Sequence, residues 1–161
     1  MSVAYDFNER KQVGAYGERY LDDFFSRWYA ITPASPMQQR QGIDRIFTRR
    51  GGESTTVEYK TDMAAARTGN AFMELISVDC RFVVGWAYSS CAELLLYYVP
   101  GQTIYAIEFS QLRLQLPFWT RKYELRSVSN EGYRARGILV PLGDLGEVAK
   151  QAITLQKGRH A

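Results

Sequence analysis

The sequence predicts one α/β domain, covering residues 1–161, in which a mixed β-sheet is flanked by helices. A long segment near the N-terminus has the apolar periodicity of a helix. Several shorter segments further along have the length of strands and are separated by turn residues. With 161 residues, 46% of them hydrophobic, the chain is long enough to bury a single core.

The first predicted element is a helix from about Asn8 to Trp28. Its apolar residues recur at three- and four-residue intervals and form a broad stripe. They are Val13, Gly17, Tyr20, Leu21, Phe24, Phe25 and Trp28. Glu18 lies beside this stripe, so we expect it at the edge of the buried face. The alternative is a solvated glutamate that pairs with a neighbouring side chain.

A polar segment broken by prolines, from Pro33 to Gln41, follows and is predicted to be a loop. The next segment, from Gly42 to Lys60, has the pattern of a β-hairpin. Its turn is predicted at Arg50–Glu53, where two glycines lie side by side. This places Asp44 on the first strand of the hairpin and Glu58 on the second.

The second strand of this hairpin is predicted to divide its side chains between two faces. Glu58 and Lys60 share one face because side chains two residues apart in a strand point the same way. Val57 and Tyr59 point to the other face. Pairing around the predicted turn would bring Asp44 near Glu58, so two acids and a lysine are expected to converge.

The segment after Lys60 is predicted to be a flexible loop, from Thr61 to Asn70, followed by a strand from Ala71 to Val78. Asn70 and Glu74 would share one face of that strand, so Glu74 is a candidate for an additional carboxylate beside the site. Ordinary turn chemistry explains Gly69-Asn70 equally well.

The rest of the chain is predicted to supply scaffold. In order, the expected elements are a turn at 85–90, strands at 93–99 and 103–107, a helix from Ser110 to about Leu116 ended by Pro117, a hairpin with strands at 123–128 and 133–142, and a helix from about Gly143 to Leu155. Most of the aromatic residues in this region are expected to pack in the core or at a partner interface. The alternative is that they stack on unpaired bases. These residues are Trp86, Tyr88, Tyr97, Tyr98, Phe118, Trp119 and Tyr123.

The cluster of Asp44, Glu58 and Lys60 favours metal-assisted chemistry on a phosphate ester. Mg²⁺ prefers oxygen ligands and is often held by one or two carboxylates, with waters and substrate phosphate completing its coordination. A metal there would lower the pKa of a bound water, while the lysine holds the attacking water. The cluster therefore indicates phosphodiester hydrolysis with Mg²⁺, or with Mn²⁺ as a substitute.

The sequence also excludes several other classes of enzyme. Its single histidine, His160, lies next to the C-terminus, so one chain cannot assemble a Ser-His-Asp or Cys-His hydrolase or a histidine-rich zinc site. The cysteines Cys80 and Cys91 lack metal-like spacing and are expected to be small packed thiols. The sequence contains neither a Walker phosphate loop nor a Rossmann glycine fingerprint.

Asp44 followed by Glu58-Tyr59-Lys60 after a hairpin-length gap, with Glu18 on a preceding helix, resembles the signature of the PD-(D/E)xK nuclease superfamily. The resemblance covers about the first half of the chain, from Glu18 to Glu74. The sequence departs from the signature at Ile43, which stands where the signature has proline.

This resemblance implies a single nuclease-like domain with a restriction-endonuclease-like core. It implies that Asp44 and Glu58 bind the metal, that the Tyr59 carbonyl completes the inner shell and that Lys60 positions the water. Glu18 would support the metal directly or through water. The expected activity is Mg²⁺-dependent endonuclease cleavage of DNA in repair, recombination, restriction or mobile-element processing.

Contacts to nucleic acid are expected from the loops beside this site. The net charge of +3 is mild, but arginine is used more than lysine in several clusters. Arg40 precedes the hairpin, and Arg67, Thr68 and Asn70 follow it, so these four residues are candidate nucleic-acid contacts. The alternatives are an ordinary connector and ordinary solvated charge. DNA is favoured over RNA as the partner.

The chain lacks an apolar stretch long enough to span a bilayer, and its N-terminus lacks the apolar core of a signal peptide. We therefore expect a cytoplasmic protein without a membrane partner, and the resemblance suggests a homodimer. Two other classes stay open. One is a catalytically silent nucleic-acid-binding or regulatory protein that retains the nuclease fold. The other is an interaction protein in which Asp44, Glu58 and Lys60 are ion-paired surface residues.

Overall fold

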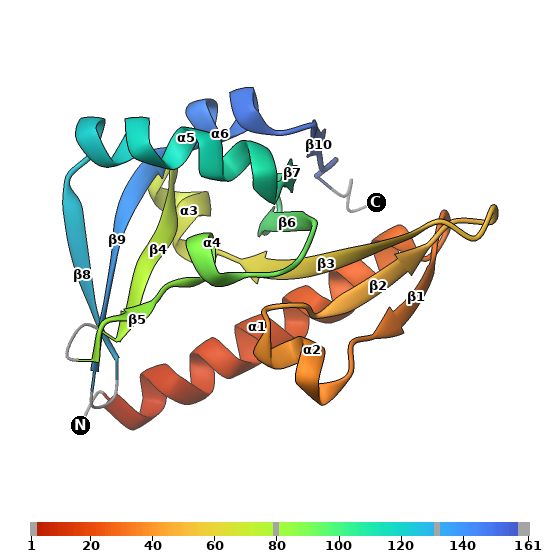
Figure 1. Ribbon diagram of the computed structural model, residues 1–161, viewed down its shortest axis with the longest axis horizontal. Helices are drawn as coiled ribbons and strands as arrows, with labels where there is room; N and C mark the ends of the chain where they lie inside the picture. The colour runs from red at the N-terminus through yellow and green to blue at the C-terminus, as the bar shows by residue number, and fades with distance from the viewer. Residues whose placement is uncertain (1–2, 79–80, 131–132, 158–161) are drawn as a thin grey trace.

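The computed structural model describes residues 3–78, 81–130 and 133–157 (Figure 1). The helices of this part of the chain are α1 (Val3–Phe25), α2 (Pro36–Arg40), α3 (Met63–Thr68), α4 (Trp86–Ser89), α5 (Phe109–Lys122) and α6 (Leu142–Val148). Its strands are β1 (Ala30–Pro33), β2 (Arg45–Thr48), β3 (Ser54–Thr61), β4 (Asn70–Val78), β5 (Val83–Val84), β6 (Leu94–Val99), β7 (Thr103–Glu108), β8 (Leu125–Asn130), β9 (Tyr133–Pro141) and β10 (Gln151–Thr154).

The strands form two sheets. The first has six strands in the order β1-β2-β3-β6-β7-β10, and its pairing is antiparallel except for the parallel neighbours β3 and β6. The second is an antiparallel sheet of four strands in the order β5-β4-β9-β8. The predicted α/β class with a mixed sheet flanked by helices is confirmed. The division into two sheets was not predicted.

Helix α1 covers one face of the six-stranded sheet (Figure 1). Its residues Leu21 and Phe25 are buried there. The sheet residues of this core cluster are Phe47, Val57, Tyr59, Leu96, Tyr98 and Ile104. The amphipathic stripe predicted for this helix is therefore its packing face, although the helix ends at Phe25, before Trp28.

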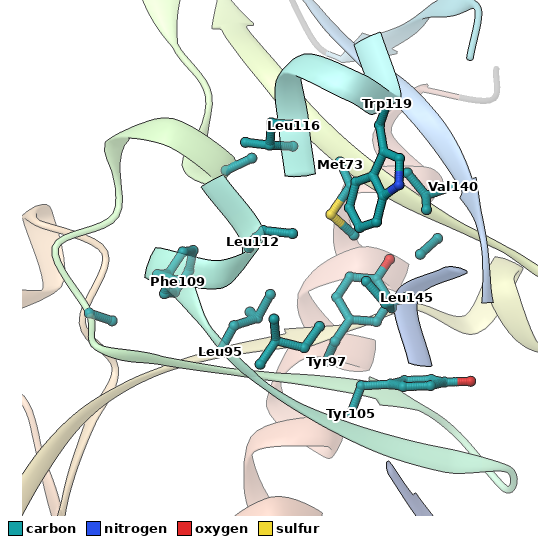
Figure 2. Packing of buried hydrophobic residues seen from close by; sticks show 14 of the residues in the cluster. Met73, Leu95, Tyr97, Tyr105, Phe109, Leu112, Leu116, Trp119, Val140 and Leu145 are labelled. Carbon is teal, nitrogen blue, oxygen red and sulfur yellow. The ribbon is translucent and has the colours of Figure 1, made fainter. Parts of the chain in front are cut away.

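The main core lies on the opposite face of the same sheet, where Leu95 and Tyr97 point away from α1. Figure 2 shows Leu112, Leu116 and Trp119 of α5 packed above them. The second sheet closes this core with buried residues of β4 and β9, which include Met73 and Val140. The face that carries this core is also the face on which Glu58 and Lys60 lie.

Two segments predicted as loops contain short helices. In the segment Pro33–Gln41, Ser35 caps α2, and Gln38 completes a capping box. In the segment Thr61–Asn70, Asp62 caps α3 by accepting a hydrogen bond from the Ala65 N–H at 2.9 Å. The prediction of a flexible loop after Lys60 is therefore wrong, because local capping stabilises a helical turn there.

Later elements also differ from the prediction. The predicted turn at 85–90 contains the short helix α4. Helix α5 continues through Pro117 to Lys122, because the burial of Leu116 and Trp119 stabilises its last turns. The predicted final helix Gly143–Leu155 is wrong over its second half, since α6 ends at Val148 and β10 then pairs with β7.

Both strands of the predicted second hairpin, β8 and β9, are present and paired. The centre of its turn, Cys80 and His160 lie outside the described residues. Cys91 is exposed, so the prediction that it packs as a small thiol is wrong. Within the described ranges, no helix combines the length and the apolar character needed to cross a membrane.

Candidate active site

Strand β3 presents Glu58 and Lys60 on the face that points away from α1. Glu58 is almost fully buried, with 4% of its side chain exposed, whereas 34% of the Lys60 side chain is exposed. The Lys60 Nζ lies 2.7 Å from the Glu58 Oε1. Their partner strands β2 and β6 hold β3 inside the sheet, so this pair is attached to a rigid element.

The second carboxylate oxygen of Glu58 is unpartnered. Glu58 Oε2 is buried and has no hydrogen-bond partner among the described residues. A buried charged oxygen without a hydrogen-bond partner lowers the free energy of unfolding by several kcal/mol, because its lost contact with water is not replaced. A cation or a cation-bound water would remove this penalty, so Glu58 fits the role of a metal ligand.

Asp44 immediately precedes β2 and faces Glu58. The register pairs Arg45 with Val57, so Asp44 is the next position along the strand and stands opposite Glu58. The Asp44 N–H donates to the Val57 carbonyl at 2.9 Å, and the Asp44 Oδ2 accepts a hydrogen bond from the Tyr59 N–H at 2.7 Å. The carboxylate is therefore fixed by the strand that carries Glu58.

The electrostatics of Asp44 follow from this position. Burial raises the pKa of the Asp44 carboxyl above its ordinary value, and the nearby negative charge of Glu58 adds to the rise. The hydrogen bond from Tyr59 and the positive charge of Lys60 act in the opposite direction. Each of these groups acts on the Asp44 carboxyl, so the structure brings Asp44, Glu58 and Lys60 together.

Glu18 does not join these three residues. Its Oε2 lies 3.3 Å from the Arg45 Nη2, and Arg45 also binds Asp22 at 3.1 Å. The Arg45 guanidinium lies 5.4 Å from the centre of the Tyr59 ring, on the α1 side of the sheet. The structure thus places Glu18 on the face opposite Glu58. It is ion-paired, as in the alternative prediction, but its partner is Arg45 on β2 and not a neighbour on the helix.

Tyr59 connects the two faces through its backbone and side chain. Its N–H serves Asp44, while its hydroxyl donates to Asp22 on α1 at 2.9 Å. Burial and the Asp22 carboxylate raise the pKa of the Tyr59 hydroxyl far above its ordinary value. The proposed use of the Tyr59 carbonyl as a metal ligand remains a prediction.

Lys60 opens into a cleft of about 320 Å³ between the two sheets. Asp62 and Tyr97 line its first wall, and the Tyr97 hydroxyl donates to the Asp62 carboxylate. Burial raises the pKa of Tyr97, and the Asp62 charge adds to the rise. Trp86 also lines the cleft, with its ring centre 5.3 Å from the Lys60 Nζ.

Asp62 was not predicted to belong to the site, and Trp86 and Tyr97 were predicted only as core residues or, alternatively, as aromatics that stack on bases. Asp62 was within reach of prediction, because it follows Lys60 by two residues and so continues the alternation of Glu58 and Lys60. No local signal identifies Trp86 or Tyr97, since their places depend on packing between distant segments.

The four predicted nucleic-acid contacts lie outside this cleft. Arg40 is the exposed last residue of α2, and Arg67 and Thr68 are exposed at the end of α3. The Asn70 side-chain amide donates to the Thr68 carbonyl at 3.2 Å, as in ordinary turn chemistry. Glu74, in contrast, does line the cleft.

A larger cavity, of about 710 Å³, lies away from this chemistry. Its lining includes Phe25, Phe47, Leu94 and Ile153, but none of Asp44, Glu58 and Lys60. Several of these apolar residues belong to the α1 face of the sheet. We therefore base the candidate site on its charged groups rather than on cavity size.

The site and the fold define an α/β protein with a carboxylate–lysine cluster on a hairpin. No group of three or more acidic, histidine or cysteine side chains suited to a metal ion occurs in the described part of the chain. A site of two carboxylates is still sufficient for Mg²⁺ when waters and phosphate oxygens supply the other ligands. Comparisons with protein-family models, curated proteins and solved structures found no match to this chain.

Proposed function

We propose that this protein is a Mg²⁺-dependent nuclease that hydrolyses phosphodiester bonds in DNA. The observation that carries the proposal is the buried, unpartnered oxygen of Glu58, which lies in the same cluster as Asp44 and Lys60. Two carboxylates and an ammonium group are suited to bind a hard cation and to stabilise a phosphate under attack.

Asp44 and Glu58 are the residues that would hold the metal, with Mn²⁺ as a substitute for Mg²⁺. The family resemblance adds the Tyr59 carbonyl to this set. When bound, the ion supplies charge neutralisation at the phosphate and a water of lowered pKa. The raised pKa of the Asp44 carboxyl means that this ligand loses its proton less readily than an ordinary aspartate, so metal binding is expected to strengthen with pH.

Lys60 is proposed to position the attacking water and to stabilise negative charge on the phosphate. Its ammonium is held between the Glu58 carboxylate, at 2.7 Å, and the Trp86 ring, at 5.3 Å. One third of the side chain is exposed in the cleft, so a phosphate can reach the ammonium. Its location supports the role assigned by the resemblance.

The proposal is tested by incubating the purified protein with Mg²⁺ or Mn²⁺ and single-stranded, duplex, flapped or four-way-junction DNA. The Lys60→Ala variant and a matched set of RNA substrates are run in parallel. We expect metal-dependent DNA cleavage that is lost in Lys60→Ala. If wild-type protein cleaves none of the substrates and neither metal changes its melting temperature, the proposal is wrong.

A second candidate function is nucleic-acid binding without catalysis on the same fold. Two observations favour it: Lys60 is already paired with Glu58 at 2.7 Å, and Glu18 is held by Arg45. Such a protein would bind DNA with an affinity that falls steeply as salt rises, and it would not cleave DNA. An interaction protein without a nucleic-acid partner would show no salt-dependent DNA affinity.

We also propose that the protein is cytoplasmic and that it forms a homodimer. A homodimer carries two sites, so it can act on both strands of a duplex. Cys91, an exposed free thiol, is compatible with a reducing compartment. Analytical ultracentrifugation of the purified protein, with and without DNA, tests the dimer.

A further inference from the structure

We infer that the cleft beside Lys60 receives one unstacked nucleotide of single-stranded DNA, with the phosphate at Lys60 and the base against the second sheet. This inference rests on the proposed nuclease function and specifies its substrate. It follows from the different character of the two walls of the cleft.

The first wall belongs to the six-stranded sheet and carries the Lys60 ammonium. Lys60 lies near the end of β3, Asp62 follows this strand as the cap of α3, and Tyr97 comes from the parallel neighbour β6. A phosphate bound at the Lys60 ammonium would therefore lie on this side of the cleft, next to the Glu58 carboxylate that pairs with Lys60.

The second wall is unsuited to phosphate. It is formed by β4, β8 and β9, which contribute Phe72, Glu74, Val128 and Ala135 to the cleft. The Glu74 carboxylate would repel a phosphate group, and the apolar side chains of this wall could not solvate one. An aromatic base can pack against Phe72 and Val128, and its exocyclic amino group can donate to Glu74.

Regular strand alternation places Glu74 on the same face of β4 as Phe72, and both line the cleft. The pairing of β4 with β9 is regular from Asn70 to Glu74 and shifts register only between Glu74 and Ile76. Gly137 is the partner of Glu74 in this pairing, and its lack of a side chain leaves room for the Phe72 ring. A Cβ at position 137 would lie 2.7 Å from the nearest atom of that ring.

The arginines of the second sheet do not contribute to this wall. Arg134 and Arg136 are exposed and flank Ala135 on β9, so they point to the face opposite the cleft. Among the described residues, the cations that line the cleft are therefore Lys60 and Arg10 of α1, and the second sheet adds none to neutralise the phosphates of a duplex. This arrangement favours a single strand over a duplex.

The size of the cleft also favours a single unpaired nucleotide as its occupant. About 320 Å³ lies at the lower end of the range for small-molecule sites, which is roughly 300–1,000 Å³. Paired bases are stacked inside a duplex and can reach such a wall only after being flipped out. An unpaired base reaches it without that cost.

Trp86 borders the cleft where the two walls meet. Its ring is near Lys60, so a base attached to the bound phosphate would lie beside this ring. Base stacking on an aromatic side chain is worth about 1–3 kcal/mol by alanine substitution, which corresponds to roughly 5- to 150-fold in affinity. Trp86 is thus the residue that tests the inference most directly.

The test measures the fluorescence anisotropy of labelled oligonucleotides, with EDTA present so that cleavage cannot occur. We expect a single strand to bind at least about tenfold more tightly than a blunt duplex of the same sequence. Trp86→Ala should lose about tenfold in single-strand affinity, while Trp86→Phe should retain most of it. Phe118→Ala, which removes an exposed ring outside the cleft, is the matched control and should bind as wild type.

A second variant guards against the failure of Trp86→Ala to fold, since Trp86 also packs against the core. Glu74→Gln keeps size and polarity but removes the acceptor charge. Wild type should bind oligo-dC more tightly than oligo-dT, because cytosine carries an amino donor and thymine does not. Glu74→Gln should reduce this difference by several-fold, and circular dichroism should show an unchanged fold.

The outcomes separate this inference from the nuclease proposal. Metal-dependent cleavage of a duplex, with no preference for single strands, would leave the nuclease proposal intact and overturn the inference. Single-strand binding that depends on Trp86, together with no cleavage of any substrate, would remove the nuclease proposal and support the cleft as a nucleotide site. Folded Trp86→Ala and Glu74→Gln variants that bind as wild type would also overturn the inference.

Discussion

The carboxylate of Asp44 accepts a hydrogen bond of 2.7 Å from the backbone N–H of Tyr59. This bond crosses from the residue before β2 to the residue between Glu58 and Lys60. A change in hairpin register would therefore break the bond and separate the acids at the same time. The geometry of the site is thus coupled to the pairing of β2 with β3.

The first prediction concerns the two acids of the hairpin. If the proposed function holds, Asp44→Ala and Glu58→Ala should each lower metal-dependent cleavage by about a thousandfold or more, because each would remove a proposed ligand of the metal. Both variants should still fold, which circular dichroism can confirm. Glu53→Gln, in the exposed turn of the same hairpin, is the control and should cleave as wild type. Unchanged cleavage in either alanine variant would remove the site assignment.

The second prediction concerns Glu18. The family resemblance makes it a metal ligand, whereas the structure pairs it with Arg45 at 3.3 Å. Because 45% of its side chain is exposed, this pair contributes about 1 kcal/mol or less to stability. We expect Glu18→Gln to lower cleavage by less than about tenfold, in contrast to Asp44→Ala. A loss as large as that of Asp44→Ala would show that Glu18 moves to the metal.

The third prediction concerns the stability of the metal-free protein. The pKa of Asp44 is raised in the folded protein, so the protonated carboxyl favours folding. This stabilisation is fully present below the pKa of the unfolded chain and is lost as pH rises through the folded pKa. At pH 7 the ionised carboxylate therefore costs stability.

Asp44→Asn removes that cost and keeps an acceptor for the Tyr59 N–H. We expect this variant to melt at a higher temperature than wild type at pH 7. The difference should shrink as pH falls towards 3.8, the ordinary aspartate value. Melting curves across this pH range, recorded with EDTA, provide the measurement. A lower melting temperature for Asp44→Asn at pH 7 would contradict the prediction.

The fourth prediction concerns metal addition. A ligand that binds only the folded state stabilises it by about 2.7 kcal/mol at a hundred times its dissociation constant. For a chain of this size, this corresponds to a rise in melting temperature of about 5–10 °C. Wild type should show the rise with Mg²⁺ or Mn²⁺, and Glu58→Gln should not. An equal rise in both proteins would mean that the metal binds elsewhere.

The fifth prediction concerns the contact that seats α1 on the sheet. A Cβ at Gly17 would lie 1.8 Å from the Thr61 Oγ1, immediately after Lys60. Gly17→Ala should therefore destabilise the protein by about 1–3 kcal/mol, as overpacked cores do. Gly14 lies on the same helix with no atom within 4 Å of its Cβ position. Gly14→Ala should stabilise the protein by about 0.5–1 kcal/mol, and urea unfolding of the two variants tests the contrast.

Much of the candidate site could be predicted because it is built from local patterns. The alternation of Val57, Glu58, Tyr59 and Lys60 determines which side chains share a face of a strand. The turn at Arg50–Glu53 predicted Asp44 on the paired strand, and the structure places it immediately before that strand, β2. These relationships span fewer than about twenty residues and follow from strand periodicity and turn chemistry.

The predicted secondary structure was wrong where contacts with distant segments, or local helix caps, outweighed the pattern of the sequence. Pro117 was expected to end a helix, yet the burial of Trp119 continues it. Residues Gln151–Thr154 were expected to be helical, yet pairing with β7 makes them a strand. Asp62 was expected in a flexible loop, yet it caps α3.

The sequence by itself determined that Glu58 and Lys60 share one face of a strand, because side chains alternate along a strand. The register that sets Asp44 opposite Glu58 was decided by the pairing of β2 with β3. The tertiary structure decided that Glu18 pairs with Arg45 and that Trp86 and Glu74 border the cleft. It also decided that the strands divide into two sheets. These features depend on contacts between segments far apart in the chain, whose relative positions are fixed by the packing of buried side chains and not by any local periodicity.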